Sequence, residues 1–205
     1  MLSCIVEGHG ERHALPVLAR RVGEALQPAV YWDVPPAIRV PRSKLLRQGE
    51  LERSVRLARA NVVSSGDGTG AVLVVIDADD DCAALLGPEL LQRAVSAAGE
   101  VPVGVVLAVA EFEAWFLAAM PSLRGRRGIR PDADTVAAPE SIRGAKEALR
   151  RQMLPGCSYS ETTDQSALVA LMDLDAARSA DSFDKLWRVL QDLGKGLLFN
   201  DSGER

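Results

Sequence analysis

The stretch AVLVVI, residues 71 to 76, constrains the fold more than any other part of the chain. Its valines and isoleucine favour a strand, and the run has no polar face. A strand that is apolar on both sides has to be covered on both sides, which is typical of the middle of a parallel sheet. Clustered negative charge follows it at once, in the form of Asp77, Asp79, Asp80 and Asp81.

Strand and helix signals alternate through the first 120 residues. Strands are predicted over residues 2–6, 28–40, 71–76 and 101–110. Helices are predicted where apolar residues recur every three or four positions, over residues 11–26, 43–57, 88–98 and 112–120. Gly49 weakens the continuity of the second of these helices. The alternation favours an α/β domain with a mainly parallel central sheet.

The pattern changes after residue 120. A polar stretch with several glycines and prolines is typical of a loop, and only helical signals follow it, over residues 140–153, 164–173 and 181–193. We interpret residues 1–120 as the α/β domain. Residues 121–205 are interpreted as a loop and a C-terminal helical extension, packed on the first part as one globular unit.

Composition narrows the class of protein. The 205 residues carry a net charge of −4, which does not indicate a nucleic-acid binder as a whole but says little about local patches. No apolar stretch approaches the roughly 18 residues of a membrane span, and the N-terminus lacks the pattern of a signal peptide. We therefore expect a cytoplasmic protein without membrane contact. The three cysteines form no CxxC pair, which favours free thiols over a zinc site.

Acidic residues follow three of the predicted strands. Glu7 comes after the first strand, Asp77 and Asp79 after the third, and Glu111 and Glu113 after the fourth. The carboxyl ends of parallel strands meet at one edge of a sheet, where functional groups collect. Clustered carboxylates repel one another and are costly to bury, and a divalent cation relieves both penalties. Ligands that are all oxygen suit Mg²⁺ or Mn²⁺.

A plainer explanation competes for some of these acids. Aspartate stabilises turns and caps helices, so we expect Asp80 and Asp81 to be turn or N-cap residues rather than ligands. Asp77 and Asp79 share a face if the chain stays extended. Glu111 and Glu113 point to different faces of a helix, so only one of them is expected to reach the site.

Basic residues supply candidates for phosphate contacts. One cluster follows the second predicted strand, beside the acids, and consists of Arg39, Arg42, Lys44 and Arg47. A second cluster, in the polar loop, is better explained as a solvated surface and consists of Arg124, Arg126, Arg127 and Arg130. Lys146 could stabilise negative charge that develops during a reaction. His9 is a candidate for phosphate contact or proton transfer, since HGERH is not the HExxH of zinc enzymes.

Several stretches together resemble known families. VEGHGE at 6–11 and VIDADDD at 75–81 resemble the Toprim domain, the metal-binding α/β module of topoisomerases, bacterial primases and overcoming-lysogenization-defect nucleases. The chain is more closely similar to a bacterial family of unknown function, DUF4276, described as Toprim-like. That similarity extends over most of the chain, through RVPRSKLL at 39–46, EFEAWFLA at 111–118, YSETTDQ at 159–165 and SFDKLWRVL at 182–190.

The resemblance implies a three-layer Toprim-like fold and a Mg²⁺ site. By analogy with Toprim nucleases, Glu7, Asp77 and Asp79 would be catalytic, and the carboxylates would hold one or two ions against the scissile phosphate. The implied metal ligands are Glu7, Glu11, Asp77, Asp79 and Glu113. Substrate contacts would come from His9, Arg39, Arg42, Lys44 and Lys146.

Three functions stay open at this point. The first is a Mg²⁺-dependent nuclease acting on nucleic-acid phosphodiesters. The second is a non-catalytic metal-binding module within a larger assembly, because relatives of this kind are often encoded beside an ABC or AAA-type ATPase and are suspected of roles in phage defence. The third is a hydrolase or transferase of a small phosphate ester. The sequence does not determine the oligomeric state.

Overall fold

The structure is a computed structural model that describes residues 1–66 and 68–200, with side chains described as far as residue 196. Its centre is a sheet of four parallel strands, β1 (Leu2–Val6), β2 (Ile38–Arg39), β3 (Ala71–Asp77) and β4 (Val103–Ala108). Their order across the sheet is β2-β1-β3-β4. The parallel sheet predicted from the sequence is confirmed.

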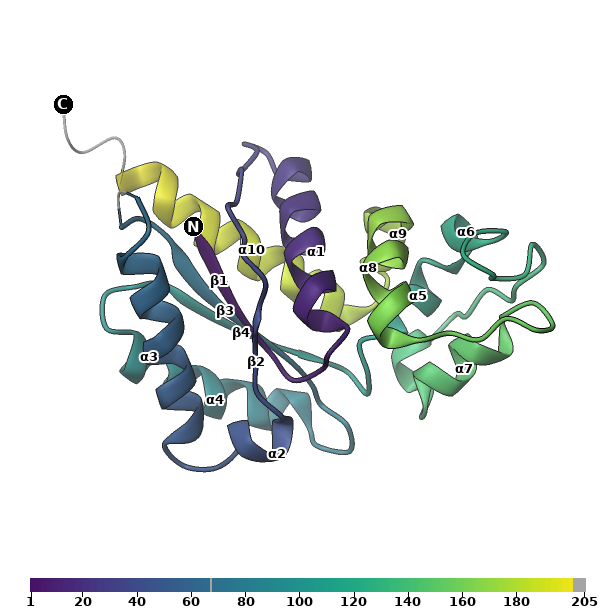
Figure 1. Cartoon of the computed structure of the whole chain (residues 1–205), viewed down its shortest axis with the longest axis horizontal. Coiled ribbons are helices and arrows are strands. Elements are labelled where there is room, and N and C mark those ends of the chain that lie inside the picture. Colours follow the sequence, from purple (N-terminus) through teal and green to yellow (C-terminus); the bar gives the residue numbers. More distant parts are fainter. Residues whose placement is uncertain (67, 201–205) are drawn as a thin grey trace.

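Helices cover both faces of this sheet (Figure 1). Helices α1 (Glu11–Ala25) and α10 (Asp181–Asn200) lie on one face, and α3 (Glu50–Val63) and α4 (Ala83–Ala98) lie on the other. Strand β3 shows why two layers are needed. Leu73 and Val75 pack under the first pair of helices, whereas Val74 and Ile76 pack under the second, and all four are at most 1% exposed. The three-layer α/β arrangement is therefore confirmed.

The remaining helices are short. They are α2 (Arg42–Leu45), α5 (Ala114–Ala118), α6 (Met120–Leu123), the 3₁₀ turn η1 (Pro139–Ser141), α7 (Ala145–Arg151), α8 (Glu161–Leu171) and α9 (Leu174–Ala177). Helices α5 to α9 form a lobe beyond the carboxyl ends of the strands (Figure 1). Among the described residues, no helix combines the length and apolar character needed to cross a bilayer.

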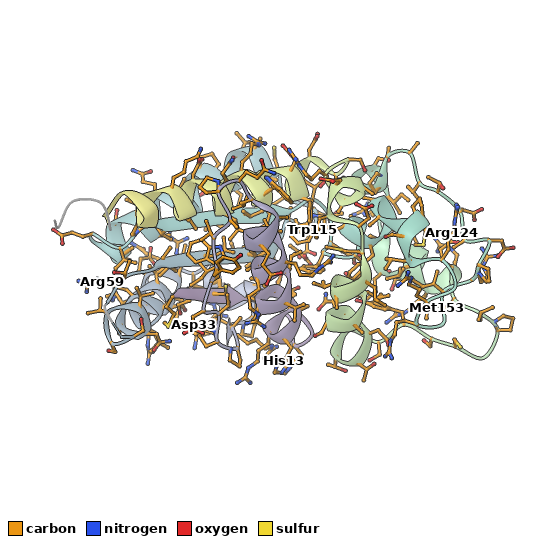
Figure 2. All side chains as sticks on the ribbon, turned by 90° about the horizontal axis from the view of Figure 1, so that it is seen from above. His13, Asp33, Arg59, Trp115, Arg124 and Met153 are labelled. Carbon is orange, nitrogen blue, oxygen red and sulfur yellow. The ribbon has the colours of Figure 1, made fainter. Side chains whose placement is uncertain are left out.

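An aromatic cluster joins the lobe to the sheet. Trp115 packs against Phe112 and Phe183 with ring centroids 4.5 and 5.4 Å apart, and its indole N–H donates to the Ser182 hydroxyl at 2.8 Å. Figure 2 shows Trp115 in the middle of the molecule, between the sheet and the lobe. Helix α10 is the last described helix of the chain, but Ser182 and Phe183 near its start contact Trp115 of α5. The two helices therefore belong to one core.

Element boundaries differ from the predicted ones where glycine or proline is involved. The predicted strand 28–40 pairs only at Ile38–Arg39. The predicted helix 43–57 is two helices, because Gly49 between them has a φ of 84° that ends regular helix. Helix α4 begins five residues before Pro88, which the helix accommodates in its second turn.

Candidate functional site

The carboxyl ends of three strands bring distant acids to one edge of the sheet. Val6 pairs with Val75, and Asp77 pairs with Ala108, so the three strands end at nearly the same level. Glu7 directly follows β1, Asp77 is the last residue of β3, and the acids near residue 111 follow β4. The topology thus gathers side chains about 35 to 106 positions apart, as the sequence predicts.

Backbone donors hold the central carboxylates in place. Glu7 Oε1 accepts a hydrogen bond from the Asp77 backbone N–H, and Asp77 Oδ1 accepts one from the Phe112 backbone N–H at 2.8 Å. Each acid is therefore anchored by the next strand across the sheet. Each of these two bonds employs one oxygen of the carboxylate.

Glu11 is held at the first turn of α1. It is only 5% exposed, and its Oε2 accepts the Gly8 backbone N–H at 3.1 Å. A Cβ at position 8 would lie 2.9 Å from Glu11 Oε1, so Gly8 leaves room for this carboxylate. Glu11 belongs to the same acidic group as Glu7, although Glu7 precedes the helix.

The two acids after β4 have different surroundings. Glu113 is 2% exposed, and its Oε1 accepts the Tyr159 hydroxyl at 2.7 Å. Glu111 is partly exposed, and its Oε2 accepts the Lys146 backbone N–H at 2.7 Å. The charge of Glu113 raises the pKa of Asp77, whereas Glu111 lines a cavity beside Asp79 and Asp80.

Burial and mutual repulsion raise the pKa values of the central acids. Burial raises the pKa of Asp77 well above its usual range, and the charges of Glu11, Glu7 and Glu113 raise it further. Burial, reinforced by Glu7 and Glu113, raises the pKa of Glu11 to about 7. Burial also raises the pKa values of Glu7 and Glu113, even though hydrogen bonds oppose the shift. We call Glu7, Glu11, Asp77 and Glu113 the acidic cluster.

Asp79 lies at the rim of this cluster. Strand β3 ends at Asp77, and Asp79 has a φ of 50°, so the alternation expected for an extended chain no longer determines its direction. Its side chain is exposed, and its charge contributes to the raised pKa of Glu7. Its N–H donates to the oxygen of Ala110, which itself has a φ of 60°. Positive φ at a residue other than glycine is costly and concentrates at functional sites.

Arg42 of α2 holds residues 77–81, which we call the aspartate turn. Its Nε donates to the backbone oxygen of Asp77 at 2.9 Å. Its Nη2 donates to the backbone oxygen of Ala78 at 3.2 Å and to the Asp81 carboxylate. Asp81 is therefore a turn residue, as expected. No aspartate side chain caps α4, whose N-cap is Cys82, so the N-cap alternative is wrong.

The other predicted substrate contacts divide into paired and unpaired residues. Lys44 pairs with Glu50 at 3.4 Å. Arg39, at the end of β2, and His9, just before α1, are exposed, and their side chains form no hydrogen bond or ion pair within residues 1–66 and 68–196. Together they are the side chains of this set that remain available to a ligand at the mouth of the site.

Lys146 lies within reach of the acidic cluster but is paired. Its Nζ is 2.6 Å from Glu161 Oε1. Burial lowers the pKa of Lys146, but the hydrogen bond with Glu161 and the charges of Glu113, Glu161 and Glu111 outweigh it, and the pKa is raised. The ammonium is thus held in its charged form beside Glu113.

A cavity opens next to the turn. It has a volume of about 310 Å³ and is lined by Asp79, Asp80, Ala110, Glu111, Arg143 and Gly144. Arg143 pairs with Asp80 across it at 2.6 Å, and both side chains are exposed. The mouth therefore carries both signs of charge.

Sequence reasoning assigned no role to Tyr159 or Glu161, which contact Glu113 and Lys146. Both belong to YSETTDQ, a stretch that matches the family pattern. The available signal was a hydroxyl and an acid two positions apart in that stretch, but nothing local indicates that they meet residues 113 and 146.

The donor chemistry of the acidic cluster fits a hard divalent cation, because every donor is an oxygen and the charges of Glu7 and Glu113 raise the pKa values of Glu11 and Asp77. As they stand, no three Asp, Glu, His or Cys side chains in the described part of the chain are grouped so that they could hold a metal ion. An ion would therefore have to draw the carboxylates closer together.

Comparison with known proteins gives one result. The model of a family described as a domain of unknown function, DUF4276, matches residues 6–191. No curated protein and no solved structure matches the chain significantly.

Proposed function

Since this chain belongs to the DUF4276 family, whose description names no activity, we propose its function from the acidic cluster: a Mg²⁺-dependent nuclease, which hydrolyses phosphodiesters of nucleic acid. One observation carries the proposal. Asp77 is partly buried at the carboxyl edge of a parallel sheet, where desolvation and the charges of three further carboxylates raise its pKa. Such an arrangement is costly unless a cation or a proton compensates it.

The residues divide into roles by position. Glu7, Glu11, Asp77 and Glu113 would hold Mg²⁺ or Mn²⁺, with Asp79 at the rim as a further ligand or as a group that orients water. When bound, such an ion polarises a phosphoryl oxygen and makes water a better nucleophile. Lys146 would stabilise charge on the phosphate, and Arg39 and His9 would contact the nucleic-acid backbone.

A metal-binding module without activity of its own is the alternative. It is favoured by the pairing of two cations that a nuclease would use. Arg42 holds the aspartate turn, and Lys146 pairs with Glu161. In this alternative the acidic site would regulate or stabilise a larger assembly, such as one that contains an ABC or AAA-type ATPase. An ATPase partner and a role in phage defence are compatible with both functions and are proposed with them.

A Mn²⁺ titration followed by electron paramagnetic resonance tests the proposed site. We expect saturable binding that Asp77→Asn weakens about tenfold or more. Asparagine retains the oxygen that accepts the Phe112 N–H, so the variant should remain folded. Asp192→Asn, an exposed change on α10, is the matched control and should bind like the unchanged protein.

Cleavage assays then separate the two functions. Single-stranded and duplex DNA and RNA, with Mg²⁺ or Mn²⁺, should be cut by the unchanged protein and not by Asp77→Asn. Binding of Mn²⁺ without cleavage, with and without a co-expressed ATPase, would favour the non-catalytic module. Absence of any Mn²⁺ binding would overturn both.

A further inference from the structure

The hydroxyl of Tyr159 is buried against a carboxylate of the acidic cluster. It donates to Glu113 Oε1 at 2.7 Å, and both side chains are 2% exposed. The two residues are 46 positions apart, so the contact joins the C-terminal extension to the loop after β4. A buried phenol needs a hydrogen-bond partner, and this one bonds a carboxyl oxygen rather than a backbone oxygen.

One contact holds the ring of Tyr159, and another holds the backbone of the residue after it. It packs edge-on against Phe116 of α5, with centroids 6.5 Å apart and planes at 68°. Ser160 follows directly as the N-cap residue of α8, and its N–H donates to Asp164 Oδ2 at 2.9 Å. Since the backbone and the ring are both held, the hydroxyl has a fixed place above Glu113.

Helix α8, which begins two residues after Tyr159, packs against α1. The two helices pack together so closely at Gly10 that a Cβ there would lie 2.4 Å from the Glu161 backbone oxygen. Glu11, the next residue along the chain, belongs to the acidic cluster. One helix contact thus sets the positions of both Glu11 and the tyrosine that holds Glu113.

We propose that Tyr159 is a positioning residue for the metal site: its hydroxyl fixes one oxygen of Glu113 and leaves the other for the ion. The C-terminal extension is then a necessary part of the site and not only a covering layer. This inference rests on the proposed function, because it needs an ion at the acidic cluster. Tyr159 itself does not touch the ion or the substrate.

A double-mutant cycle on the full chain tests the inference, with Mn²⁺ affinity as the measurement. Tyr159→Phe is expected to weaken Mn²⁺ binding about tenfold, because this is the usual effect of removing a hydrogen bond to a residue that coordinates the metal. Tyr159→Phe added to Glu113→Gln should cause no further loss, because the tyrosine acts through that carboxylate. Tyr31→Phe is the control, since Tyr31 is the chain's other tyrosine and is 84% exposed.

Each outcome of the cycle has a separate meaning. Unchanged affinity in Tyr159→Phe overturns the role of Tyr159 while the metal site stands. An equal loss with and without Glu113→Gln shows a general packing effect and also overturns it. If the unchanged protein binds no Mn²⁺, the proposed function fails first.

A second measurement serves if Tyr159→Phe does not fold. In the Tyr31→Phe protein, 3-fluorotyrosine labels position 159 alone, and its ¹⁹F resonance reports on the hydroxyl. We expect the resonance to shift on adding Mg²⁺, in parallel with saturation of the site, and to move again in Glu113→Gln. A resonance that ignores both changes would overturn the inference.

Discussion

Glu11 shows at the scale of one residue what the acidic cluster costs the protein when no cation is present. Burial raises its pKa to about 7, so the folded state binds this proton more tightly than the unfolded chain does. An acid with a raised pKa stabilises the fold below its unfolded pKa, near 4.5, and that stability is lost as pH rises to about 7. Without metal, stability should therefore fall across this window.

The prediction is measured with Glu11→Gln, which keeps an oxygen for the Gly8 N–H but cannot ionise. In urea unfolding with a chelator, the variant should gain on the unchanged protein between pH 4.5 and 8, by up to about 3 kcal/mol. Comparing two proteins cancels the acids whose pKa values are lowered, such as Glu52 and Asp184. A difference that does not vary with pH would show that Glu11 ionises freely.

Residue positions at strand ends could be predicted from the sequence, but their partners could not. Glu7 and Asp77 follow apolar runs, and the parallel topology alone brings such ends together. Whether Glu111 or Glu113 turns inward depends on how α5 begins, and the match between Glu113 and Tyr159 depends on packing between segments 46 residues apart. No local pattern contains that information.

At the scale of the element, the contact between α1 and α8 tolerates no side chain at Gly10. A Cβ there would lie 2.3 Å from Gln165 Oε1 and 2.4 Å from the Glu161 backbone oxygen, and the backbone cannot move away cheaply. Gly10→Ala should lower the free energy of unfolding by about 1–3 kcal/mol. Gly196→Ala, in α10 with open space around it, should instead raise it by up to about 1 kcal/mol. Equal effects in denaturant melts would contradict this packing.

Arg42 of α2 bonds the backbone of the aspartate turn. Arg42→Ala removes three hydrogen bonds, two of them to backbone oxygens that would be left without this partner. We expect a loss of about 2 kcal/mol in stability and weaker Mn²⁺ binding, because the turn that carries Asp77 loosens. Arg39→Ala, an exposed change nearby, should alter neither quantity. Normal Mn²⁺ affinity in Arg42→Ala would mean that the turn holds itself.

The same two variants test which arginine would contact nucleic acid if the protein is the proposed nuclease. The position of Arg42 in the sequence favoured a phosphate contact, but its donors are engaged with the turn. Arg39→Ala should reduce the slope of log affinity against log salt by about 0.9, whereas Arg42→Ala should leave the slope unchanged. The opposite pattern would restore Arg42 as the phosphate contact.

Elements were predictable where local signals agree and less so where tertiary contacts decide. The apolar run of β3 and the periodic pattern of α1 need no partner to be recognised. Strand β2 pairs at two residues only, and Leu2 N donates to Asp33 O in the segment before it. The sequence predicts that α4 begins at Pro88, because proline is typical of a helix start. The helix begins at Ala83 instead and continues through Pro88, and Leu90 and Ala94 pack on the sheet.

At the scale of the whole molecule, the last helix, α10, packs against the sheet and against α1, which come from the first part of the chain. Helix α10 packs on β4 so closely that a Cβ at Gly104 would lie 2.3 Å from Val189 Cγ1. Phe183, Leu186 and Leu190 of this helix are 0% exposed and belong to the same core as α1. The sheet is formed by residues 1–120, and one of its faces is covered in part by α10. That face would be exposed if the last helix were absent.

A chain that ends at residue 180 should consequently fail to fold. Each of the three buried side chains contributes about 1.5–3 kcal/mol, and together they approach the whole stability of an ordinary domain, about 5–15 kcal/mol. We expect residues 1–180 to lose cooperative thermal unfolding and near-ultraviolet circular dichroism. A peptide of residues 181–205 added in trans should restore both, because it supplies the missing face of the core.

Two altered peptides make this last prediction specific. Replacing Phe183, Leu186 and Leu190 by alanine should abolish the rescue, whereas Arg188→Ala, on the exposed side of α10, should not. Rescued protein should also regain Mn²⁺ binding, because Ser182 at the start of α10 bonds both Trp115 and the Val109 N–H at the end of β4. If residues 1–180 alone unfold cooperatively and bind Mn²⁺, the sheet and its acidic cluster form without α10, and the last helix is a cover rather than part of the core.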